Sequence, residues 1–346
     1  MRAVLCESFS GIDHLKVGEK ADPVPGPGEV VIDVRAATVQ YVDIKVVEGK
    51  SLLNTNKLDH HFGRKINLEL PLTPGSEAAG VISAVGEGVT RFKVGDRVLG
   101  SALVGGWAEK MRLQEDEACL IPDGMDWLTG GAFYVLYFTA SYALMNKGGL
   151  QPDDTVLVLG AGSGAGLAAV EIAKAIGAYV VAAASTDEKL ALAKDRGADS
   201  LLKYPAGPLD LAAQKQLAAD YKLAANGREI TVVADYVGGD YAEPAMRAMA
   251  FKARYLSVGF SAGVPSIPMH VIFNKNGSII GVEPVADGRL PGENPELMTQ
   301  LFAWAAEGKL KPVISRTFPL ESVREALNLL NDRKSVGRVM LELAPA

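Results

Sequence analysis

Apolar runs in the middle of the chain alternate with glycine turns and amphipathic stretches. The run at 155–159 is followed by a glycine-rich turn, a helix-like stretch at 164–176 and a second apolar run at 179–184. A strand, a glycine turn, a helix and a strand in this order predict the first half of a dinucleotide-binding unit. The alternation continues, and six strands are expected, at 155–159, 179–184, 200–202, 229–235, 254–258 and 278–282. This number predicts an α/β fold with a complete doubly wound parallel sheet.

The N-terminal part of the chain has a different pattern. Short apolar runs separated by Gly and Pro occur at 2–5, 29–37, 80–85, 97–99 and 108–112, which predicts a compact antiparallel barrel or sandwich. A long helix is expected at 128–144. The end of the chain predicts elements that rejoin the first domain: a helix at 295–307, a strand at 313–318, a helix at 321–332 and a strand at 337–343. We therefore expect two domains, residues 1–126 together with 287–346, and residues 127–286.

The glycine-rich turn carries the candidate phosphate contacts. Gly160, Gly162 and Ala165 fit the spacing G-x-G-x-x-A, with further glycines interleaved. Glycines let the backbone turn tightly and approach a pyrophosphate, and the following helix offers N–H groups and the positive end of its dipole. Gly162, Ser163, Gly164 and Ala165 are therefore candidate cofactor-binding residues. The alternative is a purely structural turn.

The end of the second strand bears on which dinucleotide binds. NAD sites place an Asp or Glu about 20 residues after the glycines, on the ribose 2′-hydroxyl, but residues 182–186 hold no carboxylate. Ser185, Lys189 and Tyr204 are candidates to donate to a 2′-phosphate instead. The alternative is that Ser185 and Thr186 only cap the next helix, with Lys189 solvated. Because capping and phosphate binding are compatible, the sequence favours NADPH over NADH.

Composition limits the classes of partner. With 346 residues the chain is long enough for two cores, and 48% hydrophobic and 22% charged residues are typical of a soluble globular protein. A net charge of −6 without a basic stripe argues against nucleic acid. Two cysteines, Cys6 and Cys119, are too few for a disulfide framework. The N-terminus is expected to be a strand rather than a signal peptide, and no window holds the roughly 20 apolar residues of a membrane helix. We expect a cytoplasmic enzyme that acts on a small molecule.

Six further segments have a recognisable spacing: PGPGEVVIDVRAATVQYVD (25–43), PLTPGSEAAGVISAVGEGVTRFKVGDRVLG (71–100), GGWAEKMRL (105–113), FTASYAL (138–144), DYVG (235–238) and KSVGRVML (334–341). With them, nearly the whole chain resembles the medium-chain dehydrogenase/reductase superfamily, in its zinc-independent quinone oxidoreductase branch. The resemblance implies a GroES-like catalytic domain, a Rossmann cofactor domain, and homodimers paired through the last Rossmann strand.

Two departures from the zinc members of this superfamily argue against catalytic zinc. Those members carry a Cys three residues before the Asp of the first-domain turn, and a His before the Glu of the PG-x-E stretch. The corresponding residues here are Gln40 and Ser76, and neither is a zinc ligand. The cysteine lobe of many zinc members is missing from 101–112 as well. His60 and His61 are adjacent, without a third ligand in view, and are interpreted as loop residues; no metal is predicted.

Without a Lewis acid, the resemblance implies hydride transfer to an already activated acceptor, a quinone or an α,β-unsaturated carbonyl. Such substrates spread the incoming charge onto an oxygen, which hydrogen-bond donors can stabilise. By the resemblance, Gln40 and Tyr41 line the cleft near the nicotinamide, and either can donate a hydrogen bond. The alternative is that Tyr41 only packs. Asp43 is expected to be a structural acceptor in its turn.

Other positions matched by the resemblance are expected near the cofactor: Thr139, Phe260, Ser261 and Arg333. Tyr134 and Tyr137, at the start of the predicted helix, are further catalytic candidates, with a place in the core as the alternative.

The segment 50–70 is longer than the loop usual in this superfamily and contains Lys50, Lys57, Arg64 and Lys65. It is expected to border the substrate mouth. Its positive charges could bind an anionic substrate such as an acyl-CoA, so an enoyl-CoA or acryloyl-CoA reductase is an alternative. A solvated loop without such a role is the simpler interpretation. A non-catalytic, crystallin-like NADPH-binding protein is the third possibility.

Overall fold

The computed structural model describes residues 1–50, 68–283, 291–332 and 335–343. The chain divides into two compact units. The first unit comprises Met1–Val135, Val285–Ala303 and Lys311–Ala346, and the second comprises Leu136–Pro284 and Trp304–Leu310. Each unit has its own hydrophobic core.

The second unit is built on a parallel sheet of six strands, which confirms the predicted fold class. The strand order is β10–β9–β8–β11–β12–β13, the order of a doubly wound sheet whose switch point lies between β8 and β11. The strands are β8 (Thr155–Leu159), β9 (Tyr179–Ala184), β10 (Ser200–Lys203), β11 (Val232–Asp235), β12 (Arg254–Ser257) and β13 (Ser278–Gly281). Every residue of β8 and β11 is buried, because helices cover both faces of the sheet.

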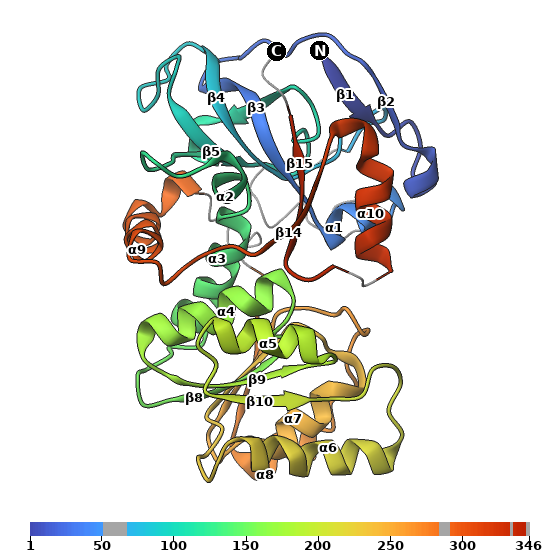
Figure 1. The fold of residues 1–346 in the computed structure, drawn as a ribbon, viewed down its shortest axis with the longest axis vertical. Helices are drawn as coiled ribbons and strands as arrows, with labels where there is room; N and C mark the ends of the chain where they lie inside the picture. Colours follow the sequence, from blue (N-terminus) through green and yellow to red (C-terminus); the bar gives the residue numbers. More distant parts are fainter. Residues whose placement is uncertain (51–67, 284–290, 333–334, 344–346) are drawn as a thin grey trace. The chain divides into compact units, whose positions relative to one another are not determined.

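The helices lie in two layers on this sheet. One face is covered by α4 (Gly164–Ile176) and α5 (Asp187–Asp195), and the other by α6 (Leu211–Ala224), α7 (Ala242–Ala248) and α8 (Met269–Lys275) (Figure 1). Because all six strands are parallel, their carboxyl ends meet at one edge. This is the edge at which sheets of this kind bind ligands.

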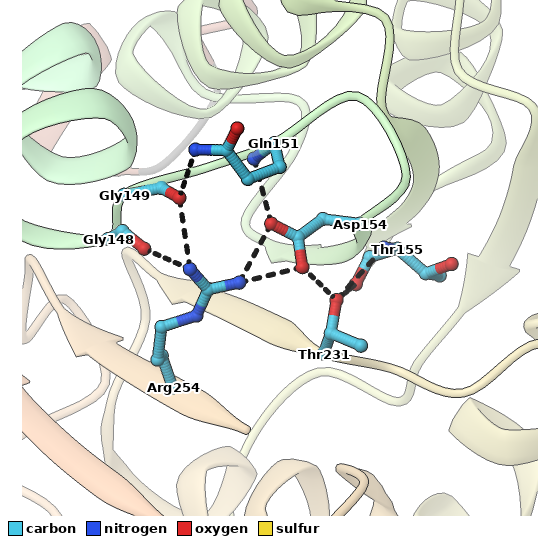
Figure 2. A network of polar contacts seen from close by, with 7 residues as sticks. All are labelled: Gly148, Gly149, Gln151, Asp154, Thr155, Thr231 and Arg254. Atoms are coloured by element: carbon cyan, nitrogen blue, oxygen red, sulfur yellow. Dashed lines mark hydrogen bonds and ion pairs between the residues drawn. The ribbon is translucent and has the colours of Figure 1, made fainter. Parts of the chain in front are cut away.

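A polar network occupies the opposite edge, where the strands begin (Figure 2). One guanidinium nitrogen of Arg254 lies 2.6 and 2.7 Å from the two carboxylate oxygens of Asp154, and the other donates to the Gly149 carbonyl oxygen at 3.1 Å. Thr231 donates to Asp154 at 2.6 Å and accepts from the Thr155 N–H at 3.0 Å. The network therefore ties the loop before β8 to the residue before β11 and to the first residue of β12.

The first unit is built on a mostly antiparallel sheet of seven strands, in the order β14–β15–β3–β4–β5–β7, with β6 paired to β3. β15 runs antiparallel to β3, so a strand from the end of the chain lies beside the longest strand of its beginning. A separate two-stranded sheet holds β1 and β2. The bounds are β1 Arg2–Leu5, β2 Lys16–Glu19, β3 Glu29–Val39, β4 Glu77–Val85, β5 Arg97–Ser101, β6 Lys110–Gln114, β7 Ala118–Leu120, β14 Ile314–Phe318 and β15 Arg338–Glu342. The chain also forms the helices α1 (Tyr41–Val47), α9 (Pro295–Ala306) and α10 (Val323–Asn331) (Figure 1).

The prediction of a single long helix at 128–144 is wrong. The segment forms α2 (Trp127–Gly131), α3 (Tyr134–Ser141) and a π-helix (Tyr142–Lys147). A Cβ at Gly131 would lie 3.1 Å from the carbonyl oxygen of Ala36 in β3. The close approach of α2 to β3 therefore favours a glycine, and glycine disfavours continuation of the helix.

Candidate functional site

The glycine turn joins β8 to α4, and three of its glycines have no room for an ordinary side chain or backbone conformation. Gly160 has a left-handed φ of 77°, a conformation that favours glycine. A Cβ at Gly162 would lie 2.2 Å from the Cβ of Lys189, and a Cβ at Gly166 would lie 2.1 Å from the Gly160 carbonyl oxygen. The third close-packing position is therefore Gly166, and not Ala165, which the spacing G-x-G-x-x-A predicts. The extra glycines between the motif positions are the sequence feature that could have indicated Gly166 instead of Ala165.

Ser163 caps α4. Its hydroxyl oxygen accepts from the Gly166 N–H at 3.0 Å and donates to the Gly160 carbonyl oxygen at 2.8 Å. The hydroxyl is thus committed to the turn itself. The N–H groups of Gly164 and Ala165 lie in the first helical turn, where no acceptor exists within the helix. Together with the helix dipole, they make this end of α4 a place for an anion.

Lys189 lies directly against the glycine turn, as its contact with Gly162 shows. It is half-buried, and so is Ser185, the first residue after β9. Thr186 is the cap of α5: its hydroxyl oxygen accepts from the Lys189 N–H at 3.3 Å. Capping therefore falls to Thr186 alone, and the structure brings Lys189 and the glycine turn together at the carboxyl edge of the sheet.

Tyr204 follows β10 at the same edge. Its ring packs at 4.8 Å from the ring of Tyr241, and the side chain is only 6% exposed. Burial raises the pKa of Tyr204 well above its usual value, so the hydroxyl stays protonated and remains a hydrogen-bond donor.

The turn after β11 is organised by Asp235, whose role could not be assigned from the sequence motif DYVG. Its carboxylate accepts from the N–H groups of Val237 and Gly238, at 2.7 and 2.9 Å, and from the hydroxyl of Tyr255. Burial raises the pKa of Asp235 despite these bonds. Asp235 is therefore a structural anchor at the carboxyl edge.

Phe260 and Ser261 follow β12 and are exposed at the same edge. The Ser261 hydroxyl donates to the Tyr236 carbonyl oxygen at 3.3 Å. Thr139 is half-buried in α3, and Arg333 lies outside the described residues. Of the two tyrosines considered as catalytic candidates in this region, Tyr137 is buried and donates to Glu171 at 2.6 Å.

The first unit holds a buried polar cluster around Gln40, the residue that precedes α1. The two N–H groups of its amide donate to the hydroxyl oxygens of Thr38 and Ser76, at 3.0 and 3.2 Å. Its backbone N–H donates to Asp43 at 2.7 Å, which confirms Asp43 as an acceptor in its turn. Gln40 and Asp43 also form a capping box at the start of α1, in which the Gln40 side chain accepts from the Asp43 backbone N–H.

Two carboxyl groups of this cluster titrate near neutrality. Glu77 is fully buried; it accepts from the Val135 N–H at 2.9 Å and lies 3.8 Å from Arg338. Burial raises the pKa of Glu77 to about 7 against the opposing charge of Arg338. Burial also raises the pKa of Asp43 to about 7. Tyr134, which neighbours Val135, is buried as well, and burial raises its pKa above the usual range.

Tyr41 differs from these buried groups because it is 45% exposed. The ammonium of Lys45 lies 5.2 Å from the centre of its ring. The phenol of Tyr41, at the start of α1, is therefore open to solvent.

The residues at the zinc-ligand positions do not fit zinc. Gln40 and Ser76 hydrogen-bond to each other and are not metal ligands of the usual kind. Among the residues that the structure describes, no group of three or more His, Cys, Asp and Glu side chains is arranged to hold a metal ion. His60 and His61 lie outside the described residues.

Within the described ranges, none of the helices combines the length and hydropathy that a membrane crossing requires.

Comparison with known proteins agrees with this arrangement. Residues 26–150 match the family model of the alcohol dehydrogenase GroES-like domain, and residues 164–303 match that of zinc-binding dehydrogenases. The chain is 33% identical to quinone oxidoreductase-like protein 2 of Bos taurus, over 99% of this chain and 92% of that protein. It is 31% identical to the quinone oxidoreductase of Homo sapiens, over 99% of this chain and 98% of that protein. A mycobacterial structure solved in complex with NADPH is 26% identical, with a TM-score of 0.86, over 99% of this chain and all of that chain. The chain therefore belongs to the medium-chain dehydrogenase/reductase superfamily, in its quinone oxidoreductase branch.

Proposed function

We propose that this oxidoreductase uses NADPH to reduce a quinone or an α,β-unsaturated carbonyl, without catalytic zinc. The observation that carries the cofactor assignment is the packing of Lys189 on Gly162. It places the stem of a lysine side chain against the phosphate-binding turn, one helical turn after the strand end at which an NAD site has a carboxylate. The NADPH complex of the mycobacterial relative supports the same choice.

The residues of the carboxyl edge fit this cofactor. The N–H groups of Gly162, Gly164 and Ala165 would meet the pyrophosphate, and Ser185, Lys189 and Tyr204 would donate to the 2′-phosphate. Ser163 would act through the cap that fixes the turn. Thr139, Phe260 and Ser261 would contact the nicotinamide half. When bound, the cofactor supplies the hydride.

Gln40 and Ser76 support the zinc-free part of the proposal. They occupy the positions of the zinc ligands and hydrogen-bond to each other. Because no metal would then polarise the substrate, the hydride acceptor must already be activated. In a quinone or enone the incoming charge moves onto an oxygen. We propose that the exposed hydroxyl of Tyr41 donates to that oxygen, and that Gln40 lies beside it in the cleft. Within the protein the Gln40 amide donates to Thr38 and Ser76, so its donation to a substrate would require one of these bonds to open.

A panel assay tests this function. NADPH and NADH oxidation would be followed after chelator treatment with a quinone, a short enone, crotonyl-CoA and a simple ketone. Turnover of a quinone or enone with NADPH, and none of the ketone, is the expected result. Loss of turnover that added zinc restores would contradict the zinc-free mechanism.

Two other outcomes of this panel would point to the alternatives. Preference for crotonyl-CoA over the neutral enone would favour a CoA-ester reductase. Lys57, Arg64 and Lys65 of the basic segment lie outside the described residues, and Lys50 pairs with Glu48 at 3.3 Å. NADPH binding without turnover on any acceptor would favour a non-catalytic role.

We further propose that two copies pair through β13. This strand is an edge of the six-stranded sheet, and the adjacent α8 exposes Met269 by 68% and Phe273 by 85%. An exposed edge beside large apolar side chains is a surface that favours association. Ile279→Lys in β13 should shift the protein from dimer to monomer in light scattering, whereas Leu211→Lys, at an exposed leucine of α6, should not. A monomeric wild type would contradict the pairing.

A further inference from the structure

An ion pair connects β10 to α5 at the carboxyl edge. The ammonium of Lys203 lies 2.6 Å from a carboxylate oxygen of Asp187. Lys203 ends β10, immediately before Tyr204, and its register partner in β9 is Ala184, immediately before Ser185. Asp187 is the first residue of α5. The pair therefore lies among the three side chains proposed to hold the 2′-phosphate.

The fold does not explain this pair. Asp187 is 82% exposed and Lys203 is 53% exposed, and ion pairs of such exposure contribute little to stability. The cap of α5 is Thr186. Asp187 is also stabilised without a cation, because a carboxylate in the first turn of a helix meets the positive end of the dipole.

The charge of Asp187 matters for the cofactor. Its carboxylate comes two residues after Ser185, close to where an NAD site holds the acid that binds the ribose 2′-hydroxyl. Unpaired, it would repel a 2′-phosphate and offer a free acceptor to a 2′-hydroxyl. Glu188 adds a second exposed carboxylate beside it, so Lys189 alone would face two negative charges.

We propose that Lys203 determines cofactor specificity by neutralising Asp187, so that the first turn of α5 accepts a 2′-phosphate. In this account, Lys189 attracts the 2′-phosphate directly. Lys203 cancels the repulsion between the Asp187 carboxylate and the 2′-phosphate, a repulsion that would otherwise favour NADH. This inference rests on the NADPH assignment proposed above.

Binding of the adenosine half alone tests the inference without a reaction. Dissociation constants would be measured calorimetrically for adenosine 2′,5′-bisphosphate and for 5′-AMP. Lys203→Ala should weaken the bisphosphate about five- to tenfold at low salt, less at high salt, and leave 5′-AMP within about twofold. Lys203→Ala combined with Asp187→Asn should recover most of the loss. Lys194→Ala, which removes the same charge from the last turn of α5, should change neither constant, and Glu188 keeps its charge in every variant.

Each outcome decides between supporting and rejecting the inference. If Lys203→Ala leaves the preference for the 2′-phosphate intact, the inference is wrong and the NADPH assignment stands. If the double variant is as weak as Lys203→Ala, Lys203 binds the phosphate itself and does not act through Asp187. A wild type that binds both nucleotides equally would reject the NADPH assignment and this inference with it.

Discussion

The two edges of the parallel sheet differ in the partners of their polar groups. Where the strands begin, Asp154, Thr231 and Arg254 bind one another and the neighbouring backbone (Figure 2). Where the strands end, α4 begins with N–H groups that have no acceptor in the helix, and Lys189 lies beside them. The same fold thus has one edge that is satisfied internally and one that is suited to an external anion.

The pKa of a buried carboxyl group also differs between the two edges. Burial alone would raise the pKa of Asp154, but hydrogen bonds from Thr231 and the Gln151 N–H, together with Arg254, hold this pKa below its usual value. Asp235 has no cation among its bonding partners, and burial raises its pKa. The buried acid where the strands begin is paired with a cation, whereas Asp235 at the carboxyl edge is held by N–H and O–H donors.

The largest effect on the carboxyl edge should come from Gly162→Ala. Its Cβ would lie 2.2 Å from the Cβ of Lys189, so the turn and Lys189 must move apart. We expect NADPH affinity to fall by about 100-fold, which corresponds to about 2.7 kcal/mol, while the protein still folds. Fluorescence titration measures this, with Gly281→Ala as a control because a Cβ there meets nothing within 4 Å. An equal loss in both variants would contradict the assignment of the turn.

Arg254→Ala should have the opposite profile. Removing the guanidinium leaves Asp154, which is about 10% exposed, without its cation. Breaking such a pair should lower the free energy of unfolding by about 3 kcal/mol and leave the NADPH dissociation constant unchanged. Urea denaturation and titration measure the two quantities. Arg247→Ala, which breaks only the surface pair with Glu243, should cost about 0.3–0.5 kcal/mol; a weaker effect of Arg254→Ala than of this control would reject the network as a scaffold element.

The pH dependence of stability should have opposite signs at the two edges. Because the folded pKa of Asp154 is lowered, its contribution is present above the unfolded value of about 4 and is lost as the pH falls through the folded pKa. Because the folded pKa of Asp235 is raised, its contribution declines as the pH rises from about 4 to the folded pKa. Asp154→Asn should therefore flatten the acid side of the stability profile, and Asp235→Asn the side above about pH 4. Urea unfolding between pH 3 and pH 8 provides the measurement, and flattening of the same side by both variants would contradict the comparison.

The sequence predicts the second unit well because its signals are local. The periodicity around 155–184 and the glycines between the runs specify a strand, a turn and a helix that the structure confirms. The prediction of one helix at 128–144 was wrong because the close contact of Gly131 with β3 is a tertiary contact, which the periodicity of the sequence does not encode. The seven-residue α1 is too short to show a helical period.

The site is predictable only in part, for the same reason. Lys189 can be proposed from the sequence because it lies one helical turn after a strand end. The network of Arg254 could not be found, because its members come from three strand beginnings far apart in the sequence. The direction of the Gln40 amide depends on Thr38 and Ser76, and the pairing of Lys203 with Asp187 depends on the alignment of two parallel strands; neither follows from spacing alone.

The measurement that tests the central claim most directly is the affinity of Lys189→Ala for NADPH and for NADH. If the carboxyl edge binds the 2′-phosphate through Lys189, the dissociation constant for NADPH should rise about tenfold or more, while that for NADH stays within about twofold of wild type. An equal change for both cofactors, or none for either, would contradict the assignment of this edge as an NADPH site.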